Sequence, residues 1–174
     1  KPNGWRDFKG QPNTDFTQPV GHSLCETALQ FAEQWVKTGP IRVTPVTCGS
    51  SVDSNTTFID REDPSNPETV TVRLHLAEAD QISKAVTCAT EDHDQWSRVP
   101  VEERFRILEQ VAQRIETRRS ALMATSLIET GKTLSESDPE VSEAIDFVRF
   151  YSLVASDFSS FEGTKATPAG PVVV

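Results

Sequence analysis

Residues 137–151, SDPEVSEAIDFVRFY, carry the pattern that decides the fold class of this chain. Their apolar side chains recur at three- and four-residue steps, the spacing of one face of an α-helix; they are Val141, Ile145, Val148 and Tyr151. Either Ser137 or Asp138 can accept the free amide groups of a first helical turn, and Ser137 with Glu140 has the spacing of a capping box. The stretch therefore predicts a helix that begins at residues 137–140.

Further helices are predicted on the N-terminal side of this stretch. One starts near Pro100, since proline suits a first helical turn, and another is capped by Ser120 and ended by Gly131. Residues 78–92 and 21–38 show the same periodicity. The inner face predicted for the helix at 78–92 consists of Ile82, Ala85, Val86 and Ala89.

The period changes in residues 41–76, where β-branched residues alternate with polar ones. This alternation predicts two or three antiparallel strands with polar connections. Residues 1–20 are rich in Pro, Asn, Gln and Gly, so we expect an extended arm that needs a surface to lie on. The predicted fold class is α+β: mostly helical, with four to five helices and a small antiparallel β ribbon.

Composition and charge exclude several functions. The chain has 174 residues, which is enough for one domain with an appended arm, and 36% of them are hydrophobic. Lys and Arg number 17 against 26 Asp and Glu, a net charge of −9, so nucleic acid and anionic membrane are poor partners. Three widely spaced cysteines predict free thiols in a reducing cytoplasm and no zinc site, and we expect no metal.

The sequence contains no recognisable catalytic set. Neither glycine-rich phosphate-binding motif can be written, and Gly131-Lys132-Thr133 lacks the upstream glycine of a P-loop, so it is interpreted as a helix end. Glu143 breaks its local pattern, because it shares a line with three apolar residues, Phe147, Phe150 and Val154. It is either a surface glutamate at the edge of that stripe or an anion that faces a pocket for an ammonium group.

A resemblance to a known protein family bears on the function of the chain and on the role of Glu143. Residues 103–151 contain the segments RFRIL (104–108), IETRR (115–119), ETGK (129–132) and EAIDFVRFY (143–151). These segments resemble the N-terminal region of the aldehyde dehydrogenase superfamily. The last one, together with QPNTDF at 11–16, is similar to the L-glutamate γ-semialdehyde (Δ1-pyrroline-5-carboxylate) dehydrogenases, including bifunctional proline utilization proteins.

The resemblance implies the N-terminal portion of an NAD-dependent enzyme that oxidises L-glutamate γ-semialdehyde to L-glutamate in proline degradation. The chain is then divided into an arm at 1–20, a helix at 21–40 and a β ribbon at 41–76. Residues 77–160 form the helical part of an aldehyde dehydrogenase N-terminal domain. Residues 161–174 lead into the nucleotide-binding sheet of the α/β fold. The first residue, Lys1, and the valine run at 172–174 suggest a fragment of a longer chain, and the predicted free thiols suggest a cytoplasmic protein.

The resemblance places the nucleophilic cysteine, the general base and the nucleotide turn beyond Val174. It therefore assigns no catalytic, cofactor-binding or metal-binding residue to this chain, and we expect the fragment alone to be inactive and to hold no NAD. It favours Glu143 as a substrate-binding residue. The implied partners are a small-molecule substrate, the remainder of the same polypeptide and further copies in a homo-oligomer.

Two alternatives stay open at this point. The parent enzyme could be another semialdehyde dehydrogenase of the same superfamily, which would differ only in substrate. The chain could also be a non-catalytic helical interaction module, a reading supported only by the absence of catalytic motifs.

Overall fold

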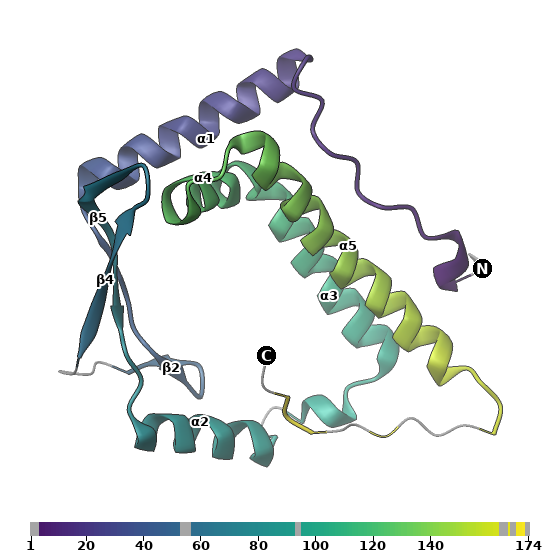
Figure 1. Cartoon of the computed structure of the whole chain (residues 1–174). Coiled ribbons are helices and arrows are strands. Elements are labelled where there is room, and N and C mark those ends of the chain that lie inside the picture. The colour runs from purple at the N-terminus through teal and green to yellow at the C-terminus, as the bar shows by residue number, and fades with distance from the viewer. Residues whose placement is uncertain (1–3, 53–56, 93–94, 164–166, 168–169, 173–174) are drawn as a thin grey trace. The chain divides into compact units, whose positions relative to one another are not determined.

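The computed structural model describes these residues of the chain: 4–52, 57–92, 95–163, 167 and 170–172 (Figure 1). They form two compact units, of which the first comprises residues 1–34 and 100–166 and the second residues 35–99 and 167–174. None of the helices in the described part is both long and apolar enough to cross a membrane.

The first unit is built from helices. It contains most of α1 (Pro19–Thr38), with α3 (Val101–Thr117), α4 (Arg119–Thr130) and α5 (Leu134–Ser159). Helices α3 and α5 lie side by side and antiparallel (Figure 1). The core lies where the apolar faces of these helices meet, and its buried side chains are Ala28, Ala112, Met123, Ala124, Val141 and Ile145.

The joints between these helices are short. Arg118 alone separates α3 from α4, so Ser120, the predicted cap, instead lies inside α4. Gly131 ends α4 as predicted: its φ of 71° is one that glycine adopts without steric cost, and its amide donates to the Leu127 carbonyl oxygen. The connection to α5 is therefore only three residues long, 131–133.

The prediction that the last helix begins at residues 137–140 is wrong by about one turn. Helix α5 begins at Leu134, because Thr133 caps it and forms a capping box with Glu136. The Ser137 hydroxyl donates to the Thr133 carbonyl oxygen at 2.9 Å, so it is not a cap. Pro139 lies inside the helix, where it removes only the amide that would bond to the carbonyl of Ser135.

The second unit is built around one strand, β5 (Asn66–His75). It pairs antiparallel with β4 (Phe58–Asp63), which confirms the predicted ribbon, and parallel with β1 (Ile41–Val43), which was predicted to be antiparallel. The strand order is β1-β5-β4. Trp35, at the end of α1, donates its indole N–H to the Thr71 carbonyl oxygen of β5 at 2.9 Å.

A small hairpin and a helix complete the second unit. Strands β2 (Val46–Thr47) and β3 (Ser50–Ser51) form the hairpin, and β2 packs against α2 (Ala79–Glu91). The predicted inner face of this helix is wrong for three of its four residues, since Ile82 is 55% and Val86 54% exposed and Ala89 is exposed as well. Periodicity shows which face of a helix is apolar, but it does not show what covers that face.

Two short 3-10 helices and the C-terminal residues complete the described part of the chain. The arm begins with a short 3-10 helix, η1 (Gly4–Asp7), and another, η2 (Trp96–Arg98), precedes α3. At the other end, Val172 is exposed, and the remainder of the predicted valine strand, residues 173–174, lies outside the described residues.

Candidate functional site

Glu143, the one site residue predicted from the sequence, lies on the exposed side of α5. Phe147, one turn further along, is 53% exposed, and Tyr151, another turn on, is 61% exposed. The Phe147 and Tyr151 rings are in tilted contact with centroids 6.1 Å apart. This face of α5 therefore presents a carboxylate beside two aromatic rings, a combination that suits a cationic group such as an ammonium.

The predicted line from Glu143 to Val154 is divided by the arm. Phe150, one of its members, is half-buried because two aromatic residues of the arm pack on its ring: Trp5 at 6.4 Å and Phe8 at 5.4 Å between centroids. Both contacts are edge-on, the geometry that aromatic pairs favour. The structure thus leaves Phe147 open next to Glu143 and covers Phe150.

The arm is held on α5 by carboxylates that accept its backbone amides. The amide of Thr14 donates to Asp138 at 2.6 Å and that of Gln11 to Asp146 at 2.6 Å, while the amide of Trp5 lies 3.4 Å from Asp157. The arm donors run 14, 11, 5 as their acceptors run 138, 146, 157, so the arm is antiparallel to α5. The sequence analysis missed this role for the aspartates.

Asp138 is the centre of a buried ionic cluster. Its side chain is fully buried and pairs with Arg119 at 2.7 Å, and Arg119 also donates to Ser142 and to the Asp138 carbonyl oxygen. The Thr14 hydroxyl donates to the same carboxylate at 2.6 Å. Burial raises the pKa of Asp138, but the hydrogen bonds from Thr14 and Arg119 outweigh burial, so the pKa lies below its ordinary value.

A second polar cluster fixes the middle of the arm. The guanidinium of Arg149, on α5, bonds to both carboxylate oxygens of Glu109 at 3.2 and 3.1 Å and donates to the Gln11 side chain at 2.8 Å. Gln11 in turn donates to Glu116 at 2.9 Å. The hydrogen bond to Glu109 raises the pKa of Arg149, so this cation stays charged throughout the physiological range.

None of the three cysteines is on α5, the helix that carries Glu143. Cys25 is in α1, Cys48 in the β2–β3 turn and Cys88 in α2. Burial and the charge of Asp138 raise the pKa of the Cys25 thiol, which lowers the fraction of the nucleophilic thiolate at neutral pH. The face of α5 around Glu143, with its carboxylate and two aromatic rings, can bind and orient a cation.

Comparison with known proteins shows which family this chain resembles. The model of the aldehyde dehydrogenase family matches residues 51–171. The 1-pyrroline-5-carboxylate dehydrogenase 1 of Halalkalibacterium halodurans is 30% identical over 145 residues, which are 83% of this chain and 27% of that protein.

Two solved structures are similar. Proline utilization A of Bdellovibrio bacteriovorus, inactivated by N-propargylglycine, has a TM-score of 0.80 and 26% identity over 87% of this chain and 16% of its own. A 1-pyrroline-5-carboxylate dehydrogenase from Thermus with bound NAD has a TM-score of 0.80 and 23% identity over 92% of this chain and 30% of its own. The chain thus spans less than a third of each of these three proteins.

Proposed function

This chain belongs to the aldehyde dehydrogenase family, and we propose that it is the N-terminal part of an NAD-dependent enzyme that oxidises L-glutamate γ-semialdehyde to L-glutamate in proline degradation. Its fold, an α+β part of the aldehyde dehydrogenase fold, is confirmed by the structural likeness. The observation that carries the proposal is the similarity over most of the chain to proteins named 1-pyrroline-5-carboxylate dehydrogenase and proline utilization A.

The residues of this chain do not fit a nucleotide site. The sequence has no glycine-rich strand-to-helix turn of the kind that cradles phosphates, and the Gly131 turn instead ends α4. NAD, which the Thermus relative binds, would supply the hydride acceptor for aldehyde oxidation. No step of that chemistry is assigned to a residue of this chain.

We propose that Glu143 binds the substrate. Glutamate γ-semialdehyde carries an α-ammonium group remote from the aldehyde that reacts, and a site for it needs an anion opposite that ammonium. The exposed Glu143 carboxylate supplies the anion, and the neighbouring Phe147 ring supplies an aromatic face to the same cation. Glu143 orients the substrate and takes no part in bond making.

Steady-state kinetics of the complete enzyme test this role. Glu143→Ala should lower kcat/KM for glutamate γ-semialdehyde by roughly tenfold to a hundredfold, because a hydrogen bond to a charged group contributes about 1.5–3 kcal/mol. For a plain aliphatic aldehyde of similar length, which has no ammonium group, kcat/KM should change little.

A matched variant controls for the loss of any carboxylate from α5. Glu140 is exposed on the same helix and pairs with Lys132, so Glu140→Ala should affect both aldehydes equally and weakly. An equal loss with both aldehydes in Glu143→Ala, with an unchanged circular dichroism spectrum, would assign Glu143 a structural role only. Absence of any turnover of glutamate γ-semialdehyde by the wild-type enzyme would instead refute the proposed substrate.

A further inference from the structure

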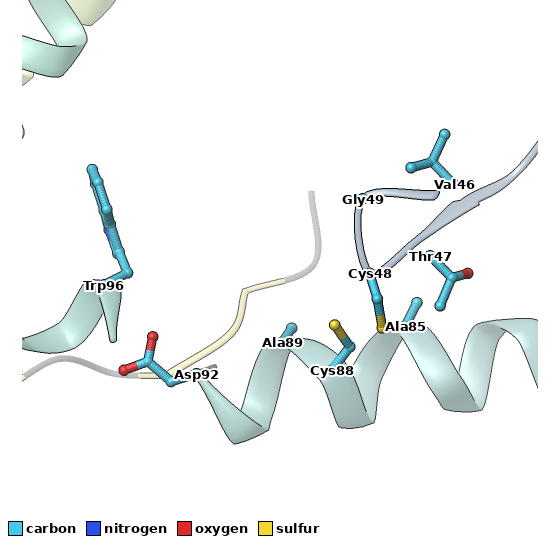
Figure 2. Close-up of a pocket in the computed structure, with 9 residues that line it drawn as sticks. All are labelled: Val46, Thr47, Cys48, Gly49, Ala85, Cys88, Ala89, Asp92 and Trp96. Atoms are coloured by element: carbon cyan, nitrogen blue, oxygen red, sulfur yellow. The ribbon is translucent and has the colours of Figure 1, made fainter. Parts of the chain in front are cut away.

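A pocket inside the second unit is lined by two cysteines. It has a volume of about 660 Å³ and lies between the β2–β3 hairpin, helix α2 and Trp96 (Figure 2). Cys48 comes from the hairpin and Cys88 from the helix, 40 positions apart in the sequence. Because both belong to one compact unit, their placement depends only on elements that pack against each other.

The local backbone sets the direction of the Cys48 side chain. Cys48 and Gly49 are the two central residues of the hairpin turn, between the paired residues Thr47 and Ser50. Both have positive φ, 51° and 75°, as the tight hairpin turn that matches strand twist requires. Cys48 thus stands at the exposed tip of the hairpin, and its side chain is directed toward α2 (Figure 2).

Cys88 faces the hairpin from the other side of the pocket. Its side chain is half-buried on α2 and rises from the helix toward the hairpin tip (Figure 2). Its neighbours on this wall, Ala85 and Ala89, add only methyl groups. The hairpin is short, with Cys48 and Gly49 between two strands of two residues each, and it packs on α2 through β2.

We propose that Cys48 and Cys88 are a redox pair in which a peroxide oxidises the two thiols to one intramolecular disulfide. One thiolate attacks a peroxide oxygen, the O–O bond breaks, and the sulfur becomes a sulfenic acid as hydroxide leaves and takes up a proton. The second thiol then attacks that sulfur, which forms the S–S bond and expels water. The two thiols lose two electrons and two protons, and hydrogen peroxide is reduced to two molecules of water.

The disulfide would fasten the hairpin to α2. It would close one side of the pocket and add a covalent link to a unit that has little apolar core, as the exposed faces of α2 show. Cys25 does not line this pocket, and it belongs to the first unit. It is therefore the matched control for a thiol that is present but not paired.

The test is oxidation of the purified protein with hydrogen peroxide, followed by mass spectrometry. The protein should lose about 2 Da per disulfide, and a non-reducing peptide map should join the peptide of Cys48 to that of Cys88. Dithiothreitol should reverse both changes. Cys48→Ser and Cys88→Ser should each abolish the joined peptide, whereas Cys25→Ser should leave it unchanged.

Several results would overturn the proposal. They are conversion of Cys48 to sulfinic acid without a joined peptide, a disulfide between two molecules, and a disulfide that includes Cys25. Thiol labelling of the wild-type protein, before and after oxidation, gives the same decision without variants: simultaneous loss of labelling at Cys48 and Cys88 supports the pair, and loss at one alone refutes it.

Discussion

The two units of the chain bury their interiors in different ways. Six buried apolar side chains form one cluster in the first unit, whereas Val72 is the one buried apolar side chain among the described residues of the second. The other buried side chains of the second unit are polar: Thr71, His75 and Gln81. The first unit therefore depends on packing and on the Asp138 cluster, and the second on strand pairing and single hydrogen bonds. Substitutions in each unit test this difference.

The largest effect is expected from Asp138→Ala in the first unit. It leaves Arg119 buried without its carboxylate and removes both hydrogen bonds that hold Thr14. Breaking a buried ion pair by removing one partner costs about 3–5 kcal/mol. Urea unfolding followed by circular dichroism should show this loss in the free energy of unfolding.

Asp157→Ala is the matched control at the other end of the arm, since its contact with Trp5 is long and exposed. Its cost should stay below about 1 kcal/mol. Equal losses in the free energy of unfolding for the two variants would mean that the contacts between the arm and α5 contribute equally. The buried cluster around Asp138 would then stabilise the arm no more than the exposed contact does. For either variant, hydrogen exchange should show faster exchange of the amides of the first unit. The exchange rates of the β5 amides should stay the same.

Acid should weaken the two units unequally. The folded-state pKa of Asp138 is depressed, so its contribution to stability is present above the unfolded-state pKa, about 3.9, and is lost as the pH falls through the folded-state value. The free energy of unfolding of the first unit should therefore decrease below about pH 4. Asp138→Asn should make this dependence on pH less steep.

Asp60 provides the comparison in the second unit. Its hydrogen bond with Arg73 also lowers its pKa, but both partners are partly exposed, so Asp60→Asn should change the acid dependence much less. Hydrogen exchange measured across this pH range in each unit separates the contribution of Asp138 to acid sensitivity from that of Asp60. A larger effect of Asp60→Asn would contradict the assignment of acid sensitivity to the buried cluster.

A smaller effect than that of Asp138→Ala is expected from Trp35→Phe in the second unit. Phenylalanine keeps an aromatic ring but cannot donate to the Thr71 carbonyl oxygen. The loss should be about 1–2 kcal/mol, since a buried acceptor is left unsatisfied. Trp96→Phe, at a 44% exposed position, is the control and should be close to neutral. A loss of more than about 3 kcal/mol in Trp35→Phe would show that the second unit has a larger core than its buried residues indicate.

Periodicity predicted the helices and the β4–β5 ribbon but not all of their ends. Two capping-box spacings lie next to each other, Thr133 with Glu136 and Ser137 with Glu140, and local sequence does not choose between them. The choice is tertiary: burial of Asp138 against Arg119 places it inside α5. The parallel pairing of β1 with β5 could not be predicted either, because the alternation of apolar and polar residues predicts a strand but not the strand with which it pairs.

The candidate site was only partly predictable. Spacing placed Glu143 on a helix, but a glutamate at the edge of an apolar stripe has the same spacing as one that faces a pocket, and the choice came from the family resemblance. The arm-binding aspartates left no comparable signal. Asp146 and Gln11 are 135 positions apart, and no local pattern connects a backbone amide with a carboxylate at that distance.

The antiparallel arm has a consequence for the time course of synthesis. Its docking residues are made before their acceptors on α5, which follow 124 to 152 positions later. At about 5–20 residues per second, the arm waits roughly 6–25 s for the first of these acceptors to be made. During that interval Trp5 and Phe8 have no Phe150 to pack against. The arm is thus synthesised before the helix that holds it, and it cannot complete its docking until α5 has been made.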